Sequence, residues 1–454
     1  MHRSVATLDD SLLRRKEVHH QQSSGAMPPS RHPPVWLRYN RAVASFLSKD
    51  IDPPNDPSNL MGAKSNGLAC LRKTTPDLNL SYPSSDAEAW SHYDEVHREM
   101  GAWLQTAPGF RMHGFAGYNG PWIENAWISH FQQRLERARA RGRRLSAVFG
   151  PYIPLFVPFT DHWVHAGFKY PEGLVAALLR VLRSDTAYIT VSQNDEGLTG
   201  KNELLMGRIP NVLVLSAGGY GHVPLPLLKQ PEAMLPRVPL KARSLLVSFV
   251  GSLDSAPNRL RHRMRDELEA AAYPFGNKAD SGTHSSQPIF AYRVARGLPA
   301  RWSAFTSLMP GMVERAICYM FGVDVWRDVM ANSRVSLCPR GYGRSSYHLA
   351  ETIQMGRVPI HIYSDIAWVP YEKLFRRQLG FVVPISRLPS LLQWLSNASS
   401  NATDELARRE RYAKKLRESH FTLAGVLSQV SRFMLNPRIS DLQCRRLPST
   451  VRDA

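Results

Sequence analysis

The chain has 454 residues, and 57 Lys and Arg against 38 Asp and Glu give it a formal net charge of +19. Hydrophobic residues make up 43% and charged residues 21%, a composition that excludes wholesale disorder, and the length predicts two or three domains. No apolar run approaches the roughly 20 residues that span a bilayer. Residues 1–17 also lack the apolar core of a secretory signal, so the sequence as written predicts a soluble chain.

The excess of positive charge favours a polyanion, a membrane surface or an anionic substrate as partner. Much of this charge lies in the helical stretches 134–144 and 408–417, where long basic side chains on a solvated face need no ligand. The chain has no zinc-finger spacing, no basic region followed by heptads and no aromatic residues interleaved with basic ones. A nucleic-acid partner is therefore disfavoured.

Cysteine and asparagine patterns say little about the compartment. The four cysteines form no C-x-x-C pair, which excludes a zinc site of that type and a dense disulfide framework: they are Cys70, Cys318, Cys338 and Cys444. Three N-x-S/T sequons would accept glycans in a secretory lumen, at a frequency that chance can supply: Asn79, Asn397 and Asn401.

Residues 1–85 are rich in Pro, Ser, Asn and His, and three Pro-Pro pairs predict a poorly ordered arm. A helix over 87–103 follows, with Ser85 or Asp86 as its cap, and 123–141 is a second helix with a basic tail. The pattern of regular structure therefore begins near residue 86.

Continuous apolar runs that end in polar or glycine-rich turns then predict a parallel sheet: 145–149, 155–159, 187–191 and 212–215, with a helix at 172–183. Loops at the carboxyl ends of parallel strands line the ligand site. Three titratable residues after these runs are candidates for chemistry: Asp161, Asp195 and His222. We expect residues 86–235 to form one α/β domain.

The segment 231–243 has three prolines among basic residues and predicts a linker, after which a second α/β pattern begins. Strands are expected at 244–250, 335–338 and 358–363, and helices at 258–271, 325–332, 345–355, 388–396 and 402–435, the last broken near 421–425. Residues 272–303 read as an irregular insertion. These patterns predict a second domain at 236–435 and a tail at 436–454.

A strand, a basic glycine turn and a helix start follow one another in residues 336–351. Gly341 and Gly343 allow a close backbone approach, and Ser345 and Ser346 lie at the helix N-terminus, where an anion is favoured. This arrangement suits a nucleotide diphosphate.

Three charged residues of the same stretch fit that interpretation. Arg340 and Arg344 can clamp phosphate oxygens, and Glu351 can accept hydrogen bonds from ribose hydroxyls. The competing interpretation is that the two arginines are ordinary loop residues and that Glu351 pairs with one of them. Neither G-x-G-x-x-G nor a P-loop is present, so composition alone leaves both interpretations open.

The stretch 336–360, with Asp365-Ile366-Ala367-Trp368-Val369-Pro370-Tyr371 after it, resembles the signature of the exostosin-type glycosyltransferases. Upstream pieces at 332–334, 248–251 and 258–265 also resemble that family, so the likeness covers most of 244–435 and more loosely 122–228. The resemblance implies an α/β, GT-B architecture, with two Rossmann-like domains facing across a cleft and the nucleotide sugar held mainly by the C-terminal one.

The resemblance also implies an activity: transfer of a sugar from a nucleotide-diphosphate sugar, with a UDP-sugar as first candidate, to a glycan or glycoprotein, with inversion and without a metal or other cofactor. Arg340, Arg344 and one of Arg259 or Arg263 would then meet the phosphates, and Glu351 the ribose. The general base would come from the N-terminal half, with Asp161 before Asp195 and His222.

Two further expectations accompany this activity. Members of the family are anchored in the Golgi by an N-terminal membrane helix, which this sequence does not show. The alternative function is a non-catalytic module of the same fold that binds a nucleotide sugar or a glycan.

Overall fold

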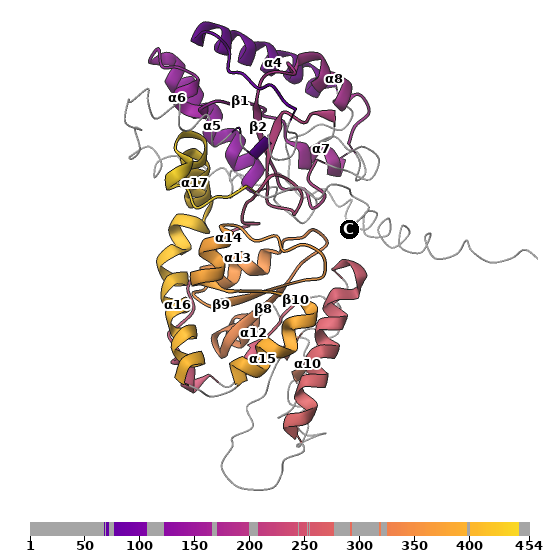
Figure 1. The fold of residues 1–454 in the computed structure, drawn as a ribbon, viewed down its shortest axis with the longest axis vertical. Helices are drawn as coiled ribbons and strands as arrows, with labels where there is room; N and C mark the ends of the chain where they lie inside the picture. Colours follow the sequence, from indigo (N-terminus) through magenta and orange to yellow (C-terminus); the bar gives the residue numbers. More distant parts are fainter. Residues whose placement is uncertain are drawn as a thin grey trace, which may run out of the picture. The chain divides into compact units, whose positions relative to one another are not determined.

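A computed structural model describes residues 68, 70–71, 77–106, 122–165, 170–198, 208–243, 245–251, 253, 255–276, 291–292, 317–318, 325–396 and 400–444. All of them belong to one compact unit, Val43–Ala454. Two parallel sheets, each accompanied by helices, organise this part of the chain (Figure 1).

The first sheet keeps its described strands in chain order: β1 (Ile153–Pro154), β2 (Tyr188–Ser192), β3 (Val212–Ser216) and β4 (Val223–Pro224), all parallel. Every residue of these strands is buried, which is why they read as continuous apolar runs. The helices of this half are α4 (Asp86–Thr106), α5 (Trp122–Ala140), α6 (Ser146–Phe149), α7 (Phe159–His165) and α8 (Leu174–Val181).

Two strand predictions in this half are wrong. The run 145–149 forms the short helix α6, and within 155–159 the chain is irregular until α7 begins at Phe159. A short apolar run looks the same in a buried helix turn and in a strand, so periodicity cannot separate them. Asp161 consequently lies in the first turn of α7, two residues after its start.

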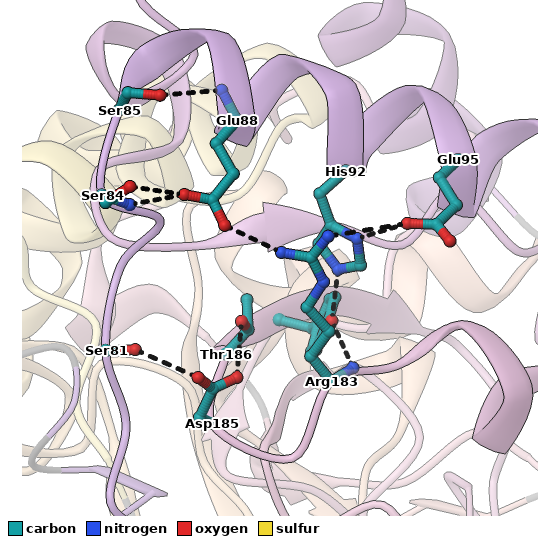
Figure 2. Close-up of polar contacts among 10 residues, drawn as sticks. Ser81, Ser84, Ser85, Glu88, His92, Glu95, Arg183, Asp185 and Thr186 are labelled. Carbon is teal, nitrogen blue, oxygen red and sulfur yellow. Dashed lines mark hydrogen bonds and ion pairs between the residues drawn. The ribbon is translucent and has the colours of Figure 1, made fainter.

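The first turn of α4 confirms the predicted cap and fixes the helix to the sheet (Figure 2). Ser85 Oγ accepts from the Glu88 amide at 3.1 Å, and the Glu88 carboxylate accepts from the amide and hydroxyl of Ser84. One turn later, His92 bonds the Tyr188 hydroxyl at 2.6 Å. Because Tyr188 begins β2, this polar cluster lies at the amino end of the sheet.

The second sheet has the order β10 (Phe381–Pro384), β9 (Val358–Tyr363), β8 (Ser333–Pro339) and β5 (Leu245–Ser248) among the described residues, again all parallel. Its helices are α10 (Leu260–Gly276), α12 (Val325–Ala331), α13 (Tyr347–Gln354), α14 (Glu372–Leu374), α15 (Leu388–Ser396), α16 (Ser400–His420) and α17 (Leu423–Leu435). One apolar core joins the strands to α10 and α15, which lie side by side (Figure 1).

Short elements complete the description: β6 (Ala291–Tyr292) pairs with β7 (Ile317–Cys318), and single turns are η1 (Leu240–Ala242), η2 (Pro257–Arg259), η3 (Phe375–Leu379), η4 (Ile385–Arg387) and η5 (Pro437–Ile439). The predicted strands and helices of this half are confirmed, including the break between α16 and α17. The insertion begins later than predicted, because α10 continues to Gly276, and most of 277–303 lies outside the described residues.

Described residues before 86, within the arm predicted over 1–85, pack against the first half of the chain. Leu71 and Leu80 are buried, and Ser81 forms a parallel bridge with Thr186 beside β2. Cys70 forms a disulfide with Cys444, with 5.6 Å between the Cα atoms. Most of residues 1–76 lies outside the described residues.

After the second sheet the chain returns to the first half. Helix α17 packs on α5 and α6, and Arg134 of α5 donates to Ser431 of α17 at 2.6 Å. Within the described ranges, no helix combines the length and the apolar character needed to cross a membrane.

Candidate functional site

Two glycine-containing loops, one from each sheet, meet at the carboxyl ends of β3 and β8. The Ser345 amide donates to the Gly218 carbonyl at 3.3 Å. A Cβ atom on Gly343 would lie 2.2 Å from the same carbonyl oxygen, and Gly219, with φ +137°, would place a Cβ 2.4 Å from the Arg344 nitrogen. Glycine is therefore required for the direct contact of the two loops.

Further side-chain contacts join the two halves of the chain beside these two loops; we call this region the junction. The Arg344 guanidinium lies 4.1 Å from the centre of the Tyr220 ring, a cation–π distance. Tyr342 donates to Glu196 at 3.0 Å. The Trp368 indole donates to the Ser216 carbonyl at 3.3 Å. The strand ends of both sheets therefore form one continuous polar region, as expected for ligand sites of parallel sheets.

Asp161 is a buried carboxyl group in the first half of the chain, on α7 beside α5. Its side chain is fully buried, and Asn125 donates to Oδ2 at 3.2 Å. The other oxygen, Oδ1, has no hydrogen-bond partner in the described part of the chain. Burial raises the pKa of Asp161 to about 7, and the hydrogen bond from Asn125 acts in the opposite direction. This group can exchange a proton near neutral pH.

Glu124, in the first turn of α5, connects the loops that follow β1 and β2. Its carboxyl accepts from the Thr160 amide at 2.8 Å, from the Thr160 hydroxyl at 2.6 Å and from the Gln193 amide at 2.8 Å. Gln193 in turn donates to the hydroxyl of Tyr347, the first residue of α13, at 3.1 Å. Glu124 therefore holds the residue before Asp161 and links it to the second half.

The sequence interpretation did not identify Glu124, because an acidic residue in the first turn of a helix is the ordinary partner of the helix dipole. Its environment is unusual for that role. Glu124 is fully buried, and desolvation raises its pKa to about 8 despite the hydrogen bonds from Thr160 and Gln193. The nearby charge of Asp161 acts in the same direction as desolvation.

Asp195 follows β2 and faces the glycine turn of the second half. A Cβ on Gly343 would lie 2.6 Å from its Oδ1. Burial raises the pKa of Asp195 to about 6, while the Arg340 charge and a hydrogen bond from the Gly343 amide act to lower it. Asp195 thus packs directly against the second loop.

His222, the third candidate base, holds the backbone of β3. Its Nδ1 accepts from the Val214 amide at 3.0 Å, and its own amide donates to the Val214 carbonyl at 2.7 Å. Burial lowers the pKa of His222 to about 4. Asp161 is consequently the better candidate base of the two.

Arg340 and Arg344 lie together in the second loop, and both are almost fully buried. A single carboxylate oxygen, Asp365 Oδ2, accepts from Arg340 Nη1 at 2.6 Å and from Arg344 Nε at 2.7 Å. Arg340 also donates to the carbonyls of Tyr342 and Gly343, which fixes the turn. The competing interpretation, in which Glu351 pairs with one of these arginines, is therefore wrong, because Asp365 is their partner.

Glu351 forms an ion pair with Lys229, a residue from the segment after β4, with 2.5 Å between Nζ and Oε1. His348, one turn earlier in α13, has Nδ1 3.5 Å from Oε2. Burial opposes ionisation of Glu351, but His348 and Lys229 together hold its pKa below the ordinary value. Glu351 is thus an ionised acceptor, and Lys229 is a site cation that sequence patterns did not indicate.

The remaining candidates occupy the edges of this region. Ser346 is the N-cap of α13, and its hydroxyl accepts from the His348 amide at 3.3 Å. Gly341 donates its amide to the Ser345 carbonyl at 2.8 Å and so closes the turn. Both serines are buried.

Of the basic residues at the start of α10, Arg259 and Arg263 are exposed. Arg261 is buried, and its Nε donates to the Arg340 carbonyl at 3.1 Å. Helix α10 turns Arg261 toward the loop and Arg263 away from it, while Arg259 belongs to η2 before the helix begins. Among the described residues, no group of three or more His, Cys, Asp or Glu is placed to hold a metal ion.

No protein-family model and no curated protein matches the sequence. Among solved structures, TarM matches with 7% identity and a TM-score of 0.32 over 57% of this chain and 57% of its own. The pneumococcal O-GlcNAc transferase GtfA, in complex with UDP and GlcNAc, matches with 10% identity and a TM-score of 0.30 over 54% of this chain and 44% of its own.

A glycosyltransferase from Rickettsia africae ESF-5 matches with 11% identity and a TM-score of 0.34, over 72% of this chain and 85% of its own. This chain thus spans about half of the length of TarM and GtfA. Such low scores say nothing about substrates. The chain itself has the predicted α/β, GT-B-like organisation, with two Rossmann-like parallel sheets whose carboxyl-end loops meet.

Proposed function

We propose that the protein is a glycosyltransferase that moves a sugar from a nucleotide-diphosphate sugar to a hydroxyl of a glycan or glycoprotein, with inversion at the anomeric carbon. The observation that carries the proposal is the buried Asp161 carboxyl in the first half of the chain, whose Oδ1 has no partner among the described residues. UDP-sugars are the first donors to test. By the exostosin resemblance, we place the reaction in the Golgi, in polysaccharide biosynthesis or protein glycosylation.

In this reaction Asp161 acts as the general base. The acceptor hydroxyl gives its proton to Asp161, its oxygen forms the new bond to the anomeric carbon, and the bond from that carbon to the phosphate oxygen breaks. A nucleoside diphosphate leaves. A base with a pKa near 7 suits this task, because it is partly ionised at neutral pH and still binds a proton well.

The donor is assigned to the second half of the chain. Glu351 is ionised and therefore accepts only, which suits the two hydroxyls of a ribose. Lys229, 2.5 Å from Glu351, is a partly exposed cation that can turn to a phosphate when ribose takes its place. Arg340 and Arg344 share one carboxylate, so this group of three residues keeps a net positive charge beside the α13 N-terminus.

One observation favours the alternative, a non-catalytic module that binds a nucleotide sugar or a glycan. Every charged group assigned to the donor already has a protein partner: Asp365 for the two arginines and Lys229 for Glu351. Binding without turnover would identify this alternative.

The experiment is calorimetry of the full chain with UDP, GDP, ADP and their sugar conjugates, together with Glu351→Gln and the matched control Glu372→Gln. Glu372 also pairs with a basic residue, Arg376, away from the junction. We expect binding of one nucleoside diphosphate, weakened about tenfold or more in Glu351→Gln by loss of a charge-assisted hydrogen bond, and unchanged in the control. A folded protein that binds no nucleotide in the panel would contradict the proposal.

A further inference from the structure

Two features outside the candidate site point to how the chain matures. Cys70 and Cys444 are 374 positions apart in sequence and form a disulfide, with Cys70 fully buried. Stable disulfides form in secreted proteins and in the lumen of the secretory pathway and are rare in the cytosol. The pair therefore indicates folding in an oxidising compartment, which the cysteine spacing alone did not.

The second feature is the sequon Asn79-Leu80-Ser81, nine residues after Cys70. Of the three sequons, it is the one whose asparagine side chain lies within the described residues, and that side chain is exposed. Leu80, between the two polar residues, is buried and anchors the segment. An exposed sequon in a secretory compartment is an acceptor for an N-linked glycan.

We propose that Asn79 carries an N-linked glycan, attached in the same oxidising lumen in which Cys70 and Cys444 pair. The inference does not depend on the proposed sugar transfer, since it rests on neither donor nor base residues. It assigns a modification site to a segment that composition alone placed in a disordered arm.

The position of Asn79 relative to the first sheet makes this modification compatible with the site. The amide of Ser81 donates to the Asp185 carbonyl at 2.7 Å, and Ser81 bridges Thr186, two residues before β2 begins. Figure 2 shows the Ser81 hydroxyl beside the Asp185 carboxylate. The candidate bases follow the opposite, carboxyl ends of the strands. The five residues of β2 alone span roughly 16 Å, so a glycan on Asn79 is separated from the site by the length of the sheet.

The test is secretion of the full chain from eukaryotic cells through an added signal peptide, followed by peptide mass spectrometry without reduction. We expect a peptide pair cross-linked through Cys70 and Cys444, and conversion of Asn79 to Asp after enzymatic release of the glycan. Mapping by peptide separates Asn79 from the sequons at Asn397 and Asn401.

The matched variants are Ser81→Ala, which removes the sequon, and Ser81→Thr, which retains it. Both should fold, because the Ser81 hydroxyl is exposed and lies 3.5 Å from Asp185, a weak contact, while the backbone bonds remain. We expect complete loss of the glycan at Asn79 in Ser81→Ala and full occupancy in Ser81→Thr. Unmodified Asn79 in folded, secreted protein, or Cys70 and Cys444 recovered as thiols, would overturn the proposal.

Discussion

The buried carboxyl of Glu124 makes the stability of the protein depend on pH in a defined direction. Desolvation raises its pKa from the ordinary 4.5 to about 8 in the folded state. Between these values the folded chain binds a proton at Glu124 that the unfolded chain does not, so stability is greatest at low pH and falls as pH rises through the folded pKa. We therefore predict that Glu124→Gln reduces this loss.

The magnitude follows from the shift. Each pKa unit corresponds to about 1.4 kcal/mol, so a rise from 4.5 to about 8 amounts to about 5 kcal/mol of unfolding free energy lost between pH 5 and pH 9. The raised pKa values of Asp161 and Asp195 act in the same direction, so the wild-type slope is steeper than that from Glu124 alone. Glutamine cannot ionise, and its variant should keep only the slope from the other groups.

The assay is urea unfolding of wild type and Glu124→Gln at several pH values, followed by tryptophan fluorescence. At low pH the variant should be less stable, by about 1–3 kcal/mol, since the glutamine NH2 presents a donor to either the Thr160 or the Gln193 amide, where a carboxyl oxygen accepts. The difference should shrink or reverse by pH 9. If both proteins lose stability equally over this range, Glu124 does not titrate as inferred.

Three further changes test the site. Asp161→Asn should lower sugar transfer at least a hundredfold with little change in nucleotide binding. Transfer by the wild type should rise with pH through about 7 as the carboxyl ionises. If the variant loses nucleotide binding together with transfer, Asp161 does not act as the base. Gly343→Ala should lower the melting temperature, since its Cβ would lie 2.2 Å from the Gly218 carbonyl oxygen. The control Gly101→Ala, in helix α4, meets nothing within 4 Å and should leave the melting temperature unchanged or raise it. Equal effects of the two variants would show that the loops do not touch. Asp365→Ala should lower the free energy of unfolding, measured by chemical denaturation, by about 3–5 kcal/mol, because it leaves two buried guanidinium groups without their carboxylate. The control Glu372→Ala should lower it by at most about 1 kcal/mol. Similar losses in both variants would contradict the buried pairing.

The fold class and most elements could be predicted from the sequence, because a strand of a parallel sheet that is buried on both faces has a continuous apolar sequence. Val358–Tyr363 and Leu388–Ser396 were predicted to the residue. The failures have a common cause. The run 145–149 is too short to show a period. The strand β10, which the sequence patterns did not predict, is only partly buried along its length, so neither segment carries a decisive pattern.

The location of Asp195 after a buried strand and the basic glycine turn could also be predicted from the sequence, whereas Asp161 lies in helix α7 and not directly after a strand. The sequence did not show which partner each charged group takes. Asp365 lies 21 residues from Arg344, and the fold of the second half brings this pair together. Lys229 lies far upstream of Glu351, and the packing of the two halves brings that pair together.

The same holds for Glu124 and for the Cys70–Cys444 pair. Sequence fixes neither the burial of a carboxyl group nor the distance between two cysteines 374 positions apart. Local pattern determined where strands, helices and turns form, because those depend on near neighbours in the chain. Tertiary structure decided which carboxyl groups are desolvated and which charges are paired, because pKa values and ion pairs depend on neighbours in space.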